Sequence, residues 1–177
     1  MLVVISGPPG TGKTTLAHEV ARAIGCPAIC RDEIKEGMVH ATPGFVPSAG
    51  DPLTMRTLAT FFDVIGLLIG RGTTVVAEAA FQDRVWRPGL TPLLNSADLR
   101  ILHCAVSPQV AEDRIIRRAT DNPLRKAHED GQPADPGTWR RTHTTFAPIT
   151  LPVPTLTVDT SDGYHPDWSE ILTFLNR

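Results

Sequence analysis

The feature that most constrains this chain is the segment 7–14, which reads Gly-Pro-Pro-Gly-Thr-Gly-Lys-Thr and fits the pattern G-x-x-x-x-G-K-[ST]. It follows the short apolar run 2–6, which is typical of a buried parallel strand, and precedes a helical pattern that begins near Lys13. Glycines at this turn let successive backbone amides point inward around a phosphate, beside the positive end of the helix dipole. The expected nucleotide contacts are Gly7, Pro8, Pro9, Gly10, Thr11, Gly12, Lys13, Thr14 and Thr15.

Two side chains of this segment predict the bound species. Lys13 can reach the β- and γ-phosphate oxygens of ATP, and the Thr14 hydroxyl is a suitable ligand for Mg2+. A dinucleotide site is less favoured, because the glycines are spaced G-x-x-G-x-G and a lysine follows them. ATP and Mg2+ are therefore expected, and NAD is not.

The rest of the chain alternates between strand and helix patterns. Apolar or β-branched runs predict further strands at 27–30, 73–79, 99–106 and 155–158. Helical spacing and caps predict helices at 32–40, from Pro52 to about Ile69 with Asp51 as N-cap, at 83–94, 108–118, around Trp139 and at 167–175. Such alternation predicts one α/β domain over residues 1–177, with a parallel sheet covered by helices.

Composition and net charge limit the kinds of binding partner that we expect for this chain. At 177 residues with 41% hydrophobic and 20% charged residues, the chain has the composition of a globular domain. A net charge of −2 gives no general attraction to nucleic acid, and no stretch was expected to be long and apolar enough to span a membrane. The first residues lack a secretory pattern, which predicts a cytoplasmic protein. Both a monomer and a homodimer are compatible with the sequence.

Cysteine and histidine positions offer no metal motif. The three cysteines, Cys26, Cys30 and Cys104, lack C-x-x-C spacing and are interpreted as buried thiols. The spacing of the histidines does not match a ligand set either, so no role was assigned to His18, His103, His128, His143 and His165.

Acidic residues after two strands are candidates for chemistry. Asp32 follows the second strand, where its carboxylate could accept the proton of an acceptor hydroxyl and position that oxygen for attack. A helix N-cap is the alternative role for Asp32. Glu78 ends the third strand, where it could hold a Mg2+-bound water or an acceptor hydroxyl.

Arginines on the 108–118 helix form a second candidate group. Arg114, Arg117 and Arg118 fall within one arc of a helical wheel, and Ala111, Ile115, Ile116 and Ala119 are expected on the opposite side. Guanidinium groups near a nucleotide could neutralise charge on the transferring phosphoryl group, with Arg125 as a further candidate. The alternative is a solvated face whose arginines pair with neighbouring carboxylates.

These features together resemble the small P-loop kinases of the AAA_33 or zeta-toxin-like type, which include chloramphenicol phosphotransferase and the kinase domain of phage polynucleotide 5′-kinase. The resemblance rests on 7–14, on Asp32-Glu33-Ile34-Lys35, on 75–79, on the 114–118 helix and on Val158-Asp159-Thr160. It implies a three-layer α/β/α sandwich with a five-stranded parallel sheet of order 2-3-1-4-5 and a helical lid at about 114–136.

The resemblance also implies roles for individual residues. It makes Asp32 the base, Lys13 and Thr14 the phosphate and Mg2+ contacts, Arg114 or Arg118 the lid arginine, and Thr160 a neighbour of adenine. Two positions depart from the family pattern. Glu78 stands where the family usually has aspartate, and Lys35 stands where polynucleotide kinases favour an arginine that holds a substrate phosphate.

The sequence is compatible with three functions. The leading one is a kinase that phosphorylates a hydroxyl of a small molecule such as an antibiotic, sugar or nucleoside. Its acceptor pocket would lie between the loop 38–50, the start of the long helix and the segment 81–86, with Lys35, Glu78 and Arg84 as substrate contacts. The alternatives were a polynucleotide 5′-hydroxyl kinase and a non-catalytic or motor-like ATP-binding switch.

Overall fold

The computed structural model describes residues 1–48, 50–121 and 138–176, and its centre is a five-stranded sheet. The strands are parallel and lie in the order β2-β3-β1-β4-β5, which confirms the order expected from the resemblance. Their bounds are Leu2–Ser6 for β1, Ala28–Cys30 for β2, Val75–Glu78 for β3, Leu99–Ala105 for β4 and Thr155–Asp159 for β5. Because β1 is central, the loop that follows it opens at the middle of the sheet's carboxyl edge.

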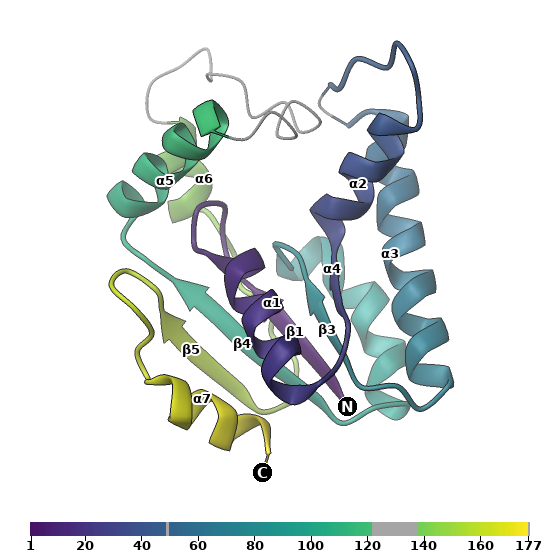
Figure 1. The fold of residues 1–177 in the computed structure, drawn as a ribbon, viewed down its shortest axis with the longest axis vertical. Coiled ribbons are helices and arrows are strands. Elements are labelled where there is room, and N and C mark those ends of the chain that lie inside the picture. The colour runs from purple at the N-terminus through teal and green to yellow at the C-terminus, as the bar shows by residue number, and fades with distance from the viewer. Residues whose placement is uncertain (49, 122–137, 177) are drawn as a thin grey trace.

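Helices cover both faces of the sheet and give the predicted α/β/α sandwich (Figure 1). Their bounds are Lys13–Ile24 for α1, Arg31–His40 for α2, Pro52–Gly70 for α3, Asp83–Leu90 for α4, Thr91–Asn95 for the 3-10 helix η1, Pro108–Asp121 for α5, Thr138–Thr144 for α6 and Trp168–Leu175 for α7. In Figure 1, α5 and α6 stand on one side of the carboxyl edge, and α2 with the start of α3 stands on the other. The loop after β1 lies between them.

Alternating side chains of β1 supply two separate cores. Leu2 and Val4 pack with α3 and α4 on one face, whereas Val3 and Ile5 pack with α1 and α7 on the other. Because both faces are covered, all five residues of β1 are buried. This explains why its sequence is continuously apolar up to Ser6 instead of alternating with polar residues.

The expectation that no segment is long and apolar enough to span a membrane was wrong for one helix. α3 has 19 residues and a mean hydropathy of 1.5, so by length and composition alone it could cross a bilayer. Its buried residues Phe61, Ile65 and Ile69 recur at helical spacing and belong to the core on the α3 side of the sheet. This face of the helix contributes to that core.

Two local predictions were wrong. The segment 83–94 does not form one helix: α4 ends at Leu90 and continues as a 3-10 helix, because Pro88 and Pro92 each lack an amide hydrogen for the helical ladder. Ile116 does not face the core with Ile115, since its side chain is 59% exposed. The lid predicted at 114–136 lies mostly outside the described residues.

Candidate functional site

The loop between β1 and α1 is shaped by glycines in the left-handed region. Gly7, Gly10 and Gly12 have φ values of 148°, 81° and 75°, which other residues adopt only at a cost. A side chain at Gly10 would also collide with α5, because its Cβ would lie 2.4 Å from the carbonyl oxygen of Ala111. The loop is therefore both turned inward and held against the first turn of α5.

Lys13 folds back over this loop. Its Nζ donates a hydrogen bond of 2.9 Å to the carbonyl oxygen of Pro8, and the Thr11 hydroxyl donates one of 2.8 Å to the same oxygen. Lys13 also lines the cavity in front of the loop. The ammonium group is thus positioned at the place where the loop amides would surround a phosphate.

Thr14 and Glu78 meet in front of the loop. The Thr14 hydroxyl donates a hydrogen bond of 3.1 Å to Oε2 of Glu78, which is buried at the end of β3. Burial raises the pKa of the Glu78 carboxyl, the nearby Lys13 lowers it, and Asp32 raises it further. A hydroxyl and a carboxylate are the hard oxygen donors that Mg2+ prefers, so these two residues fit the predicted metal.

Asp32 lies in the first turn of α2 and lines the same cavity as Lys13, Thr14 and Glu78. Cys30 occupies the N-cap position of α2, so the alternative N-cap role of Asp32 is wrong. Nη1 of Arg31 donates a hydrogen bond of 3.0 Å to Oδ1 of Asp32. The carboxylate is therefore oriented by its neighbour and faces the space in front of the phosphate loop.

The cavity has a volume of about 490 Å3 and runs from the phosphate loop to a chamber between α2, α3 and α4. Its loop end carries Lys13 and Thr14, with Asp32 and Glu78 beside them. The chamber beyond is lined by residues of α3, α4 and the preceding turns, which are Thr54, Met55, Leu58, Ala79, Ala80, Gln82, Val85 and Trp86. A smaller cavity of about 210 Å3 adjoins it and is lined in part by Gly12, Thr15 and Glu33.

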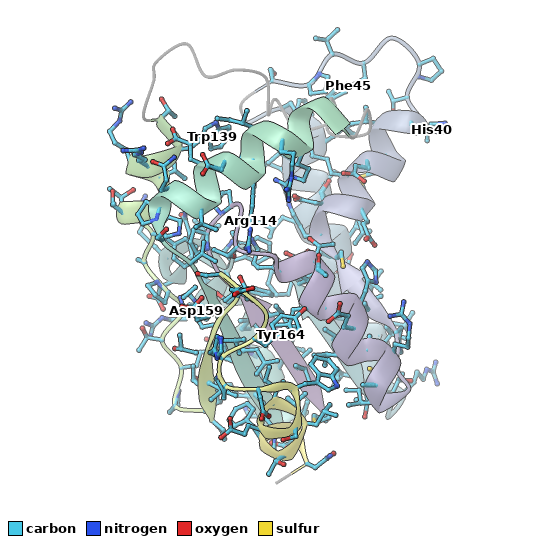
Figure 2. The ribbon with its side chains drawn as sticks, turned by 60° about the vertical axis from the view of Figure 1, so that its left-hand side comes forward. His40, Phe45, Arg114, Trp139, Asp159 and Tyr164 are labelled. Carbon is cyan, nitrogen blue, oxygen red and sulfur yellow. The ribbon has the colours of Figure 1, made fainter. Side chains whose placement is uncertain are left out.

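The arginines predicted on one face of α5 take different positions. Arg114 donates to the carbonyl oxygens of Thr160 and Ser161 at 2.7 and 3.1 Å, and Figure 2 shows it between α5 and the loop after β5. Arg118 instead lines both cavities, and Arg117 is exposed. Arg125 lies outside the described residues. Of the two candidate lid arginines, Arg118 is the one that faces the cavity.

Thr160 sits behind the phosphate loop. It is buried, and its hydroxyl donates a hydrogen bond of 2.8 Å to the carbonyl oxygen of Thr11. Together with Arg114, it connects α5, the loop after β5 and the phosphate loop into one hydrogen-bonded unit. The resemblance predicts Thr160 as a neighbour of adenine, and the sequence gives no sign of its contacts with Thr11 and Arg114, since these residues are far apart in the chain.

Lys35 and Asp51 form a buried ion pair at the far wall of the cavity. Lys35 Nζ lies 3.0 Å from Oδ2 of Asp51 and donates a hydrogen bond of 2.9 Å to Oγ1 of Thr54. Asp51 also caps α3 by accepting from the amide of Thr54 at 2.8 Å, as predicted. The pairing of Lys35 was missed, because sixteen residues separate it from Asp51. Arg84, another predicted substrate contact, is exposed.

Three residues without a recognisable spacing come together near the start of α2. Ligand atoms of His18, Cys30 and Glu33 lie within 4.8 Å of one another, and Nε2 of His18 is 2.6 Å from Oε1 of Glu33. Burial raises the pKa of the Cys30 thiol far above its ordinary value, and the carboxylates of Glu78 and Glu33 raise it further. The thiol is therefore protonated, which agrees with its interpretation as a buried thiol.

The phosphate loop and the sheet order agree with a comparison to known families. The sequence model of the AAA_33 family, described as an AAA domain, matches residues 2–149. This chain belongs to the AAA_33 family. Uncharacterized proteins of Mycobacterium tuberculosis and Mycobacterium bovis are 29% identical to it over 131 residues. That match covers 68% of this chain and 26% of each relative, so this chain spans only about a quarter of the length of these relatives.

Three solved structures with the same fold are described as kinases or as solved with a nucleotide. A protein of Chloroflexus aurantiacus described as a candidate kinase has a TM-score of 0.85 at 21% identity, with 99% of this chain and 96% of that chain covered. A sugar kinase from Janibacter has a TM-score of 0.67 at 19% identity and coverages of 99% and 94%. Kti12 of Chaetomium thermophilum, solved with ADP-AlF3, has a TM-score of 0.67 at 14% identity and coverages of 99% and 96%. The chain thus has the fold of P-loop kinases.

Proposed function

We propose that this chain is an ATP- and Mg2+-dependent kinase that transfers the γ-phosphoryl group to a hydroxyl of a small-molecule acceptor. The observation that carries the proposal is the position of Asp32, whose carboxylate lines one cavity together with Lys13 and Thr14. An acceptor bound in the chamber beyond Asp32 would have its hydroxyl between this carboxylate and the phosphate loop. Positioning of this kind is most of what phosphoryl transfer requires.

In the proposed reaction the acceptor oxygen attacks the γ-phosphorus, and the bond from that phosphorus to the β,γ-bridging oxygen breaks, so that ADP leaves. Asp32 takes the proton of the hydroxyl. Lys13 leaves the carbonyl oxygen of Pro8 and contacts the phosphate oxygens, while Arg118 neutralises charge on the transferring group. Mg2+, held by Thr14 and through Glu78, would screen the phosphate charges.

A small acceptor fits this site better than a polynucleotide end. The whole cavity, with its phosphate-loop end included, measures about 490 Å3, so the part bounded by α2, α3 and α4 leaves room for a small molecule such as a sugar. Lys35, which stands where polynucleotide kinases favour an arginine, is already paired with the buried carboxylate of Asp51. The solved sugar kinase, which shares the fold of this chain, is consistent with a small acceptor.

Nucleotide binding and transfer can be tested together. Magnesium ADP at about 100 times its Kd should stabilise the protein by about 2.7 kcal/mol, which corresponds to about 5 to 10 °C in Tm for a chain of this size. Lys13→Met should remove most of this shift. Transfer from radiolabelled ATP should then be measured with a panel of glycosides, polyols, sugar acids, nucleosides and a 5′-hydroxyl oligonucleotide.

The panel distinguishes the proposal from its alternatives. Transfer to a small alcohol supports it. Transfer to the oligonucleotide alone would instead identify a polynucleotide kinase. A nucleotide-dependent Tm shift with no transfer to any acceptor would favour an ATP-binding switch.

A further inference from the structure

The chamber beyond Asp32 has an apolar wall that is exposed to solvent. Met55 of α3 and Val85 of α4 both line the cavity, and their side chains are 64% and 52% exposed. They are two of only five large hydrophobic side chains that are highly exposed in the described residues. Leaving such side chains in water at the mouth of a cavity has a cost, which a ligand that covers them would recover.

Deeper in the chamber, the wall is rigid. Trp86 and Leu58 both line the cavity, and the ring of Trp86 packs against Phe61, Phe62 and Phe81 with centroid distances of 5.6, 5.8 and 4.9 Å. Because three phenyl rings hold the indole in place, the apolar surface exists before any acceptor binds. A preformed apolar surface lowers the ordering cost of binding an apolar group.

The charged groups on the acceptor side already have partners of opposite sign. Lys35 lies 3.0 Å from Asp51, and Arg31 lies 3.0 Å from Asp32. An acceptor carboxylate or phosphate would have to compete with these carboxylates for either cation. The chamber is therefore poorly suited to acidic acceptors such as sugar acids, and a wholly polar polyol would bring no apolar surface to cover Met55, Leu58 and Val85.

We infer that the acceptor is an uncharged amphipathic alcohol, with a hydroxyl group at Asp32 and an aromatic or aliphatic body against Met55, Leu58, Val85 and Trp86. This inference rests on the proposed function for the identity of the reacting group. The preference for an apolar body, however, is a property of the chamber and can be measured without transfer.

A matched pair of ligands tests the preference. Phenyl and methyl β-D-glucopyranoside carry the same sugar hydroxyls and differ only in the apolar group. By isothermal titration calorimetry, the phenyl glucoside should bind at least about tenfold more tightly, since covering the apolar wall with a ring is worth at least that much. Equal affinities, tighter binding of the methyl glucoside or of gluconate, or no detectable binding of the phenyl glucoside would each overturn the inference.

Variants on α3 and α4 locate the part of the chamber that gives the preference. Met55→Gln replaces an exposed apolar side chain of α3 with a polar one of similar length, and should abolish most of the difference between the two glucosides. Leu67→Gln is the control, because Leu67 lies on the same helix and is 61% exposed. Val85→Thr should reduce the difference from the opposite wall. An unchanged preference in Met55→Gln and Val85→Thr would place the apolar group elsewhere and overturn the inference.

The outcomes also separate this inference from the proposed function. Transfer to polar acceptors, with no preference between the glucosides, would leave the kinase activity standing and remove the amphipathic acceptor. A preference for the phenyl glucoside without transfer to any acceptor would support the chamber's specificity and argue against the kinase activity.

Discussion

Glu78, which we propose helps to hold Mg2+, is a residue whose negative charge lowers the stability of the folded protein. Its carboxyl is buried and accepts a hydrogen bond from the Thr14 hydroxyl. Burial makes the ionised form of this carboxyl unfavourable, and the pKa of Glu78 is therefore raised. The residue is therefore better suited to a charged ligand than to the stability of the empty protein.

Glu78→Gln should separate these two roles. Because the pKa of Glu78 is raised in the folded protein, its ionisation lowers stability once the pH exceeds the ordinary value of 4.5. The variant should therefore be more stable than the parent at neutral pH, and the difference should fall toward zero as the pH is lowered through this range. Urea unfolding at several pH values measures it, and lower stability of the variant at pH 7 would contradict the assignment. Phosphoryl transfer should decrease in the same variant.

At the scale of elements, the ion pair between Lys35 and Asp51 joins α2 to the start of α3. The carboxylate of Asp51 accepts from Lys35, from the amide of Thr54 and from the amide of Ser48. Burial alone would raise the pKa of Asp51, but these hydrogen bonds lower it to about 2. The pair therefore fixes the helix that carries Asp32 relative to the helix that lines the acceptor chamber.

Removing Asp51 should be strongly destabilising. Asp51→Ala leaves Lys35 buried without its carboxylate and removes the cap of α3, at a combined cost of about 3 to 5 kcal/mol in the free energy of unfolding. Adding Lys35→Met should recover more than half of this cost, because no unpaired charge then remains. Denaturant unfolding of both variants tests this, and a double variant no more stable than Asp51→Ala would refute it.

The same pair predicts a pH dependence. Because the pKa of Asp51 falls from 3.8 to about 2 on folding, its contribution is fully present above about pH 4 and is lost as the pH falls toward 2. The difference in unfolding free energy between the parent and Asp51→Asn should therefore be constant above pH 4 and shrink below it.

The elements themselves were largely predictable from sequence, because their patterns are local. The apolar run of β1, the glycines of the loop and the Asp51-Pro52 cap each act within a few residues. The two errors, the single helix at 83–94 and the side of Ile116, concern features that depend on packing or on several weak local effects. A helical wheel places Ile116 on the side opposite the arginines, but the wheel cannot tell where the buried arc ends, and the side chain is exposed.

Much of the candidate site required the tertiary structure. The motif identified Lys13 and Thr14, but the contacts of Arg114 with Thr160 and of Lys35 with Asp51 join residues far apart in sequence. The segments expected to form the acceptor pocket, 81–86 and the start of the long helix, do line the cavity. The sequence did not single out Met55, Val85 and Trp86 as an apolar wall within them, since each residue has an ordinary place in a helix pattern.

At the scale of the whole molecule, the two parts of the proposed site lie at one edge of the sheet. The loop after β1 is the proposed phosphate-binding part at the centre, and α2, α3 and α4 bound the proposed acceptor chamber beside it. Parallel strands make this arrangement natural, because their carboxyl ends all open to the same side. Asp32 lies where the two regions meet.

The most direct test of this account is single-turnover transfer of the γ-phosphoryl group to an acceptor from the panel, compared between the parent, Asp32→Asn and Asp63→Asn. Asp63 is exposed on α3 and serves as the control. We predict that Asp32→Asn slows transfer by about 100-fold to 10,000-fold, the usual worth of a general base, while ATP affinity changes little and Asp63→Asn transfers normally. Transfer by Asp32→Asn at the parental rate would contradict the central claim.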